Sequence, residues 1–404
     1  MKHGSQGPTR RSILVNGVRL SALGALAPHA FTGPGRGDGA QDDRVLVVLQ
    51  LTGGNDGLNT VAPHGQDAYY RLRPTLAHAP KSVHRLDEQV GLHPGLGRLA
   101  GLAKDGLLTV VHGVGHPAGD RSHFRSLEIW HTAEPYAPVG RVGWLGNLAD
   151  QLLARDPGSL PALSVGGRSS SLSMRGARAT PPVVPDDRGF KLSHVSRQIG
   201  KERGRIAQAR AGAPSELDFM RRTARIAYDA AERMSAITAQ EPAVEYPNTS
   251  LGKELRLVAQ LVRGGFGTRI FHVSFGGFDT HASQESVHGA LLGRVDAALG
   301  AFQRDLVAAG LHERVTTLVF SEFGRRAREN GSRGTDHGKG APVLLLGGAL
   351  PGGQLGRVPD LARLDDGDVP VDVDFRGVYR QLEEDWLGLK SFSKQRIDAP
   401  RLFG

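Results

Sequence analysis

Acidic and imidazole side chains gather in four parts of this 404-residue chain, each next to a short apolar run. Carboxylates and imidazoles together supply the oxygen and nitrogen donors that bind a divalent metal of hard to borderline character. Glycines beside them let the backbone approach closely. The residue types therefore indicate a metal site. The four parts are residues 53–60, 120–124, 277–281, and 321–325 with 334–338.

Each group also has a structural interpretation that needs no metal. Asp56 lies in a glycine-rich stretch typical of a turn. Asp279 and His281 are compatible with the cap of a strand end. Asp336 and His337 are more informative, because a glycine-flanked loop rarely holds adjacent ionisable residues without a functional role.

Two further polar residues are equally open to both interpretations. Ser122 precedes a predicted helix and could be its N-cap. Glu322 could form an ion pair with Arg325 or Arg326. What favours function is the joint pattern, since all the groups adjoin predicted strands.

Alternating strands and helices predict how these groups are positioned. Such a pattern is typical of a mainly parallel sheet covered by helices on both faces. The carboxyl ends of parallel strands meet at one edge, where sites of this fold class lie. Residues 140–200 resist assignment, and 201–265 are predicted as a helical insertion. Strands are expected over 44–51, 106–111, 268–275, 315–320 and 342–346, and helices over 96–103, 123–130, 289–309 and 375–387.

Composition excludes several other classes of protein. The chain has no Cys, which excludes disulfides, thiolate metal sites and a cysteine nucleophile. Its formal net charge is +9, but no run of Lys and Arg or basic–aromatic alternation indicates nucleic-acid binding. No apolar run approaches the roughly 18 residues of a transmembrane helix. The composition fits a globular protein with a hydrophobic core.

The N-terminus has the pattern of an export leader. Arg10 and Arg11 precede a weakly apolar stretch, which is typical of a twin-arginine signal. The alternative is a basic N-terminal tail. We expect residues 1–40 to be a leader and linker recognised by the twin-arginine export machinery, with the protein delivered to the periplasm or the extracellular space. Residues 41–404 are predicted to form one domain.

Together, the motifs are those of a known family. The chain resembles the bacterial domain-of-unknown-function family fifteen-oh-one, from about residue 44 to 387. That family looks like a branch of the alkaline phosphatase and sulfatase superfamily. The resemblance implies a three-layer α/β/α sandwich, alkaline phosphatase-like, with a metal site at the sheet edge. The motifs are LTGGNDGLN at 51–59, LHP at 92–94, RSHF at 121–124, GGFDTH at 276–281, SEFGR at 321–325 and GTDHG at 334–338.

The resemblance also implies roles for individual residues. By position, Asp56 matches the first metal-binding Asp of the superfamily, and Ser122 matches its nucleophile. Asp279 and His281 match a later Asp and His, and His337 matches the last His.

One position departs from the superfamily pattern. Glu322 and Phe323 stand where an Asp-His pair is usual. A phenylalanine cannot bind metal, so one ligand is lost unless Asp336 replaces it or the site holds a single metal. This departure bears directly on whether the site is catalytic.

The first functional hypothesis is an exported metal-dependent hydrolase of phosphate or related anionic esters. Ser122 would be the nucleophile, His123 or His116 would protonate the leaving group, and Arg121 and Arg325 would clamp the anionic oxygens. Mixed carboxylate and imidazole ligands fit zinc, manganese or iron. The predicted metal ligands are Asp56, Asp279, His281, Glu322, Asp336 and His337.

Two other functions stay open at this point. One is an exported binding protein or pseudoenzyme of the same fold, with a degenerate metal site, for an anionic glycan or a lipid head group. The other is a metal-free serine hydrolase, although no Gly-x-Ser-x-Gly elbow surrounds Ser122. Formylglycine-type sulfatase chemistry is not expected, because the chain has no Cys and its nearest motif, at 159–163, has Leu163 where Arg is required.

Overall fold

The computed structural model describes residues 43–404 except 118, 137–140, 157–158, 168, 180, 186–229 and 394. The predicted export leader lies outside the described residues, and so do residues 201–229 of the predicted helical insertion. Within the described part of the insertion, residues 230–238 and 250–263 are helical, as expected. No helix of the described residues is long and apolar enough to cross a membrane.

A nine-stranded sheet forms the centre of the molecule, in the order β11-β5-β10-β9-β1-β8-β6-β7, with β12 paired to β5. All of its pairings are parallel except those of β10, which runs antiparallel to β5 and β9. The strands are β1 (Val45–Thr52), β5 (Leu108–Gly115), β6 (Ala162–Val165), β7 (Val183–Val184), β8 (Ile270–Gly276), β9 (Val315–Phe320), β10 (Ala341–Leu346), β11 (Gly353–Leu355) and β12 (Val373–Asp374).

Strand β1 shows why the sheet is covered on both faces. Its side chains alternate between two cores, as the two-residue period of a strand requires. Val45, Val47 and Leu49 belong to one hydrophobic cluster, and Leu46 and Val48 belong to the other. A strand that is apolar on both sides is stable only between two layers of helices.

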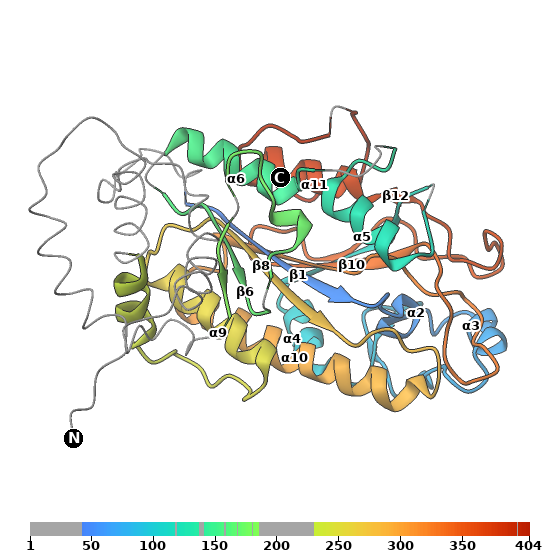
Figure 1. The fold of residues 1–404 in the computed structure, drawn as a ribbon. Helices are drawn as coiled ribbons and strands as arrows, with labels where there is room; N and C mark the ends of the chain where they lie inside the picture. Colours follow the sequence, from blue (N-terminus) through green and yellow to red (C-terminus); the bar gives the residue numbers. More distant parts are fainter. Residues whose placement is uncertain are drawn as a thin grey trace, which may run out of the picture.

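The two helical layers pack on opposite faces (Figure 1). One layer contains α4 (Gly97–Lys104), α9 (Ser250–Arg263) and α10 (Gln284–Ala308). The other contains α5 (His123–Thr132), α6 (Trp144–Arg155) and α11 (Phe375–Gln381), which continues as the π-helix η2 (Leu382–Trp386). The predicted three-layer α/β/α sandwich with a mainly parallel sheet is thus confirmed.

Smaller elements lie outside these layers. A second sheet has the order β2-β4-β3 and follows the first loop of the large sheet. These elements are α2 (Gly57–Thr60), β2 (Val61–Ala62), α3 (Asp67–Leu72), β3 (His84–Arg85), β4 (Gly91–Leu92) and the 3-10 helix η1 (Leu172–Met174).

The topology brings the polar groups to one edge of the large sheet. Strands β1, β5, β8 and β9 are mutually aligned and end at this edge, whereas the antiparallel β10 begins there. Residues 277–281 follow β8, 321–325 follow β9, and 334–338 precede β10. The predicted clustering at the carboxyl edge therefore holds, and β10 contributes through its start.

Candidate metal centre

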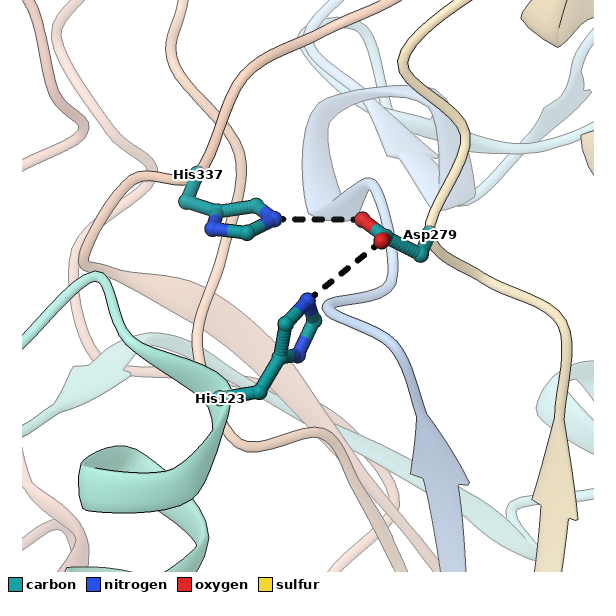
Figure 2. A group of neighbouring side chains, drawn as sticks. All are labelled: His123, Asp279 and His337. Atoms are coloured by element: carbon teal, nitrogen blue, oxygen red, sulfur yellow. Dashed lines mark hydrogen bonds and ion pairs between the residues drawn. The ribbon is translucent and has the colours of Figure 1, made fainter.

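Three side chains from three separate segments converge at this edge (Figure 2). His123 is the first residue of α5, Asp279 lies in the loop after β8, and His337 lies in the loop before β10. One ligand atom from each lies within 4.8 Å of the others. His337 Nε2 is 3.1 Å from Asp279 Oδ1, and His123 Nε2 is 3.5 Å from Asp279 Oδ2. We call these three residues the metal group.

Each imidazole of the metal group has its other nitrogen held by an acceptor. His337 Nδ1 lies 2.7 Å from the carbonyl oxygen of Arg121, which can only accept, so Nδ1 carries the proton. His123 Nδ1 lies 2.9 Å from Oε1 of the buried Glu322. Imidazoles that bind metals are usually oriented in this way, with the lone pair of the free nitrogen directed at the ion. Both Nε2 atoms are therefore directed at Asp279.

The Asp279 carboxylate stays ionised over a wide pH range. Burial alone would raise its pKa, but the Arg325 guanidinium beside it lowers it to about 2. Arg325 Nη2 lies 2.8 Å from Asp279 Oδ1. The loop approaches β1 so closely that a Cβ on Gly53, which has φ +118°, would lie 2.6 Å from the Asp279 nitrogen. Asp279 is thus a fixed anion beside two imidazole nitrogens.

A third imidazole, His281, adjoins the metal group. Its Nε2 is 3.0 Å from Asp279 Oδ1 and 2.9 Å from His337 Nε2, and its Nδ1 is 3.2 Å from Asp336 Oδ1. With both Nδ1 protons directed at acceptors, the Nε2 lone pairs of His281 and His337 face each other. A cation between them removes this repulsion.

The donor set fits a divalent metal. Two imidazoles and one carboxylate are the ligands of catalytic zinc sites that keep an open position, and they also suit manganese and iron. The side chain of Asp279 is 48% exposed and that of His123 is 29% exposed, so one side of the metal group is open to solvent. A substrate can therefore reach an ion held there.

The chain matches one described protein family. A model of the family described as "Protein of unknown function (DUF1501)" matches residues 109–375, more than half of the chain. The chain belongs to this family. A comparison with curated proteins finds no match.

Solved structures resemble this DUF1501 protein at low identity. The C-terminal periplasmic domain of EcEptC from Escherichia coli, in complex with Zn, is 12% identical, with 87% of this chain and 84% of that chain covered and a TM-score of 0.42. The lipoteichoic acid synthase LtaP from Listeria monocytogenes is 10% identical, with 88% and 79% covered and a TM-score of 0.38. The phosphonate monoester hydrolase of Agrobacterium radiobacter is 12% identical, with 86% and 74% covered and a TM-score of 0.41.

Asp56 does not lie in the metal group of the DUF1501 chain. It is completely buried, and its Oδ2 is 2.5 Å from both Arg73 Nη1 and Gln284 Nε2, while Oδ1 accepts from the Asn59 amide. Burial alone would raise the pKa of Asp56, but Arg73 beside it lowers this pKa to about 2. The prediction that Asp56 binds the metal is therefore corrected, because protein donors occupy its carboxylate.

Both arginines of the predicted anion clamp have partners within the protein. Arg325 is buried and donates to the carbonyls of Gly53, Gly54 and Thr335 as well as to Asp279. Arg121 forms a 2.6 Å ion pair with the buried Asp368. Arg325 thus holds the loops of the metal group in place, while the Arg121 side chain keeps 38% of its surface exposed.

Ser122 and Glu322 have different surroundings. Ser122 is exposed at the N-cap position of α5, directly before His123, and its side chain makes no capping hydrogen bond. Glu322 accepts hydrogen bonds from the Gly53 amide at 2.9 Å and the Ser321 hydroxyl at 3.1 Å, in addition to contacting His123. We therefore interpret Glu322 as a group that orients His123. Asp336 is exposed and holds His281.

Phe323 takes part in the site without binding metal. Its ring lies 4.9 Å from that of His123 and 4.5 Å from that of His337, measured between ring centroids. A Cβ on Gly54, which has φ +72°, would lie 2.2 Å from the Phe323 ring, so glycine is required there. Phe323 thus places an apolar ring against two imidazoles of the metal group.

The roles of three residues in and around the site are not predicted by the sequence pattern. His123 was expected to donate a proton, but its Nε2 faces the metal group. Arg73 and Gln284 were not identified, since neither lies in a polar cluster after a strand. The one sequence feature that indicates His123 as a metal ligand is its position at the start of a predicted helix, close to the sheet edge where the metal site is expected.

Proposed function

We propose that this protein is an exported metal-dependent hydrolase of phosphate or related anionic esters. The observation that carries the proposal is the orientation of His123 and His337. Both have Nδ1 held by an acceptor and Nε2 directed at the half-exposed, ionised carboxylate of Asp279. A purely structural cluster would not need to keep three donor atoms directed at one accessible point.

The residues that would hold the metal are His123, Asp279 and His337, with His281 adjoining. A divalent metal bound there would supply Lewis-acid chemistry at an ester oxygen. Ser122 directly precedes His123 and is exposed at the N-terminus of a ten-residue helix, where the first N–H groups and the helix dipole favour an anion.

In the proposed reaction the Ser122 oxygen attacks phosphorus, and the bond from phosphorus to the leaving oxygen breaks. The proton of the Ser122 hydroxyl leaves as the alcohol product gains one. A water molecule then attacks the phosphoserine, which restores the hydroxyl and releases phosphate. With His123 Nε2 directed at Asp279, His123 is not the group that protonates the leaving oxygen in this proposal.

A binding protein or pseudoenzyme remains the second candidate, on a specific observation. Both arginines expected to clamp the anion are engaged in the protein, Arg325 by four carbonyls and Arg121 by Asp368. Such a protein would bind an anionic glycan or lipid head group through the metal without turnover.

The decisive experiment combines metal content with activity. The protein is purified without chelators, its metals are measured by mass spectrometry, and a panel of phosphomonoesters, phosphodiesters and sulfate esters is assayed. One or two metals per chain with turnover of an ester supports the hydrolase. A bound metal with no turnover of the panel favours the binding protein, and no metal after reconstitution overturns the metal centre.

Two variants separate the roles of Ser122 and the metal group. Ser122→Ala should retain metal and lose turnover. Ser235→Ala is the matched control, since Ser235 is exposed on the helix at 230–238, which contacts Gly265 ahead of β8, at the opposite edge of the sheet. Unchanged turnover in Ser122→Ala would remove Ser122 as the nucleophile. His337→Ala should lose metal as well as turnover.

Export is tested separately from chemistry. Replacing Arg10 and Arg11 by lysine should abolish delivery of the protein to the periplasm or the medium if the twin-arginine machinery recognises residues 1–40. Lys2→Arg is a control that leaves this pair intact. Export that persists without the arginine pair would contradict the proposed pathway.

A further inference from the structure

A buried layer of polar side chains lies beneath the metal group. We call Asp56, Arg73, Thr280, Gln284 and Thr335 the buried polar layer; all five are buried, and four have no exposed surface. Polar groups in such a position are costly unless every hydrogen bond is made. Their contacts therefore show what the layer holds together.

Gln284, the first residue of α10, is the centre of this layer. Its Nε2 donates to Asp56 Oδ2 at 2.5 Å. Its Oε1 accepts from the Thr280 hydroxyl at 3.0 Å and from the Thr335 hydroxyl at 2.6 Å. The orientation of the amide is determined by chemistry, because the ionised Asp56 can only accept. The side chain cannot be reversed without placing two acceptors together.

The two threonines belong to the two loops that carry metal-group residues. Thr280 directly follows Asp279, and Thr335 lies two residues before His337. The Thr335 amide also donates to the Thr280 carbonyl at 3.3 Å. One oxygen of Gln284 thus joins the loop of the carboxylate to the loop of an imidazole.

Arg73 connects the layer to a third loop. It donates to Asp56 and to the carbonyls of Arg326 and Ala327, in the segment that follows β9. The preceding residue, Arg325, donates to both the Thr335 carbonyl and Asp279 Oδ1. Gln284 is therefore connected to the Asp279 carboxylate in two ways. One runs through Thr280, and the other runs through Thr335 and Arg325.

We infer that Gln284 is a positioning residue, which sets the separation of Asp279 and His337 and thereby the affinity of the site for a metal. This inference rests on the proposed metal centre. Gln284 contacts none of the metal group itself and acts through the two threonine hydroxyls. Outer partners of metal ligands typically change metal affinity by 10- to 100-fold when they are removed.

The test removes one hydroxyl and then restores it. Thr335→Val keeps the shape of the side chain and deletes the hydrogen bond to Gln284, whereas Thr335→Ser keeps the hydroxyl. The matched control is Thr317→Val, because Thr317 is equally buried on β9 and its hydroxyl has no partner among the described residues. Zinc affinity is measured by competition with a chelator of known affinity.

We expect Thr335→Val to weaken zinc binding about tenfold, and Thr335→Ser and Thr317→Val to bind within about twofold of wild type. A thermal unfolding curve of each metal-free variant shows whether weaker zinc binding comes from a general loss of stability. Equal zinc affinities in Thr335→Val and Thr317→Val, with wild type binding zinc, would overturn the positioning role and leave the metal centre intact.

A second readout does not depend on metal. Ring ¹⁵N and ¹³C resonances of the histidines are recorded in the metal-free protein. Thr335→Val should shift those of His337 and His281, and Thr317→Val should not. If wild type binds no zinc, the metal centre fails, and these spectra still decide whether Gln284 positions the loops: unshifted His337 resonances in Thr335→Val reject it.

Discussion

Asp279 and Asp56 lie in neighbouring loops at one edge of the same sheet, yet they belong to different regions. Asp279 is half-exposed among imidazole nitrogens, and Asp56 is wholly buried against Arg73. Both have a pKa of about 2, held down against burial by Arg325 in one case and by Arg73 in the other. An acidic pKa therefore does not by itself distinguish a metal ligand from a structural ion.

Access and partners make the distinction. The metal group presents lone pairs to a point that solvent can reach, while the buried polar layer leaves the Asp56 carboxylate with no open side. The first region is suited to an incoming ion, and the second to holding the loops that carry the first. Changes in the buried polar layer should therefore affect stability most, and changes in the metal group should affect metal binding most.

The largest effect on stability is expected for Arg73→Met. This substitution leaves the Asp56 carboxylate buried without its cation, which typically costs about 3–5 kcal/mol of unfolding free energy. Urea denaturation with the linear extrapolation measures it. Arg363→Met is the control, because the Arg363 side chain is 85% exposed and its pair with Asp360 should contribute under about 0.5 kcal/mol. Equal losses of unfolding free energy in the two variants would show that the buried ion pair stabilises the protein no more than the exposed one.

Much of the architecture could be predicted from the sequence. The apolar runs at β1, β8 and β9 are continuous because these strands are covered on both faces, and the glycines after β1 and β8 mark the ends of those strands. No element is predicted over residues 140–200, although their described part contains α6, β6 and β7. Strands β6 and β7 have four and two residues, too few to show a period. The antiparallel direction of β10 leaves no mark in a buried, continuous apolar run.

The candidate site was predictable in place but not in detail. Strand ends located Asp279, His337 and Glu322 at one edge, because topology alone brings them there. The role of Asp56 was not predictable, since its partners Arg73 and Gln284 lie 17 and 228 residues away in sequence. The guanidinium of Arg325 meets carbonyls from three other segments, and no spacing in the sequence indicates such contacts.

A smaller effect on stability should appear as a pH dependence in the buried region. Burial lowers the pKa of His288, which packs beside Asp56 and contacts Asn55, to about 4 from an ordinary value of 6.5. The unfolded chain therefore binds a proton that the folded chain does not, and stability present above pH 6.5 is lost as the pH falls toward 4. Between pH 7 and pH 5 this one residue should account for about 2 kcal/mol.

His288→Gln should remove the part of the pH-dependent stability that comes from His288. The glutamine amide can still donate a hydrogen bond to Asn55. Urea denaturation of the variant and of wild type at pH 7 and pH 5 gives the comparison. The variant should lose less stability than wild type on acidification. Identical losses in the two proteins would show that His288 is not the group responsible.

Phe323→Leu should have a modest effect that falls on the metal group. The ring contacts with His123 and His337 are worth about 0.5–1.5 kcal/mol beyond the apolar area that they bury. We expect a loss of about 1 kcal/mol in unfolding free energy and a several-fold weaker affinity for zinc. Phe302→Leu, in the core of the other helical layer under α10, is the control that should lose stability without a change in zinc affinity. Unchanged zinc affinity in Phe323→Leu would show that Phe323 contributes to packing only and does not position the imidazoles.

The smallest effect on stability is expected for Asp336→Asn. Asp336 and His281 are 55% and 43% exposed, and exposed pairs contribute about 0–1 kcal/mol. The hydrogen bond from Asn330 to Asp336 Oδ1 can persist in the variant, because the asparagine keeps one carbonyl oxygen there. Urea denaturation should therefore place Asp336→Asn within about 1 kcal/mol of wild type, while Arg73→Met lies several kcal/mol below. If Asp336→Asn were as destabilising as Arg73→Met, Asp336 would belong with Asp56 as a structural ion, and the loop of His337 would depend on it for folding.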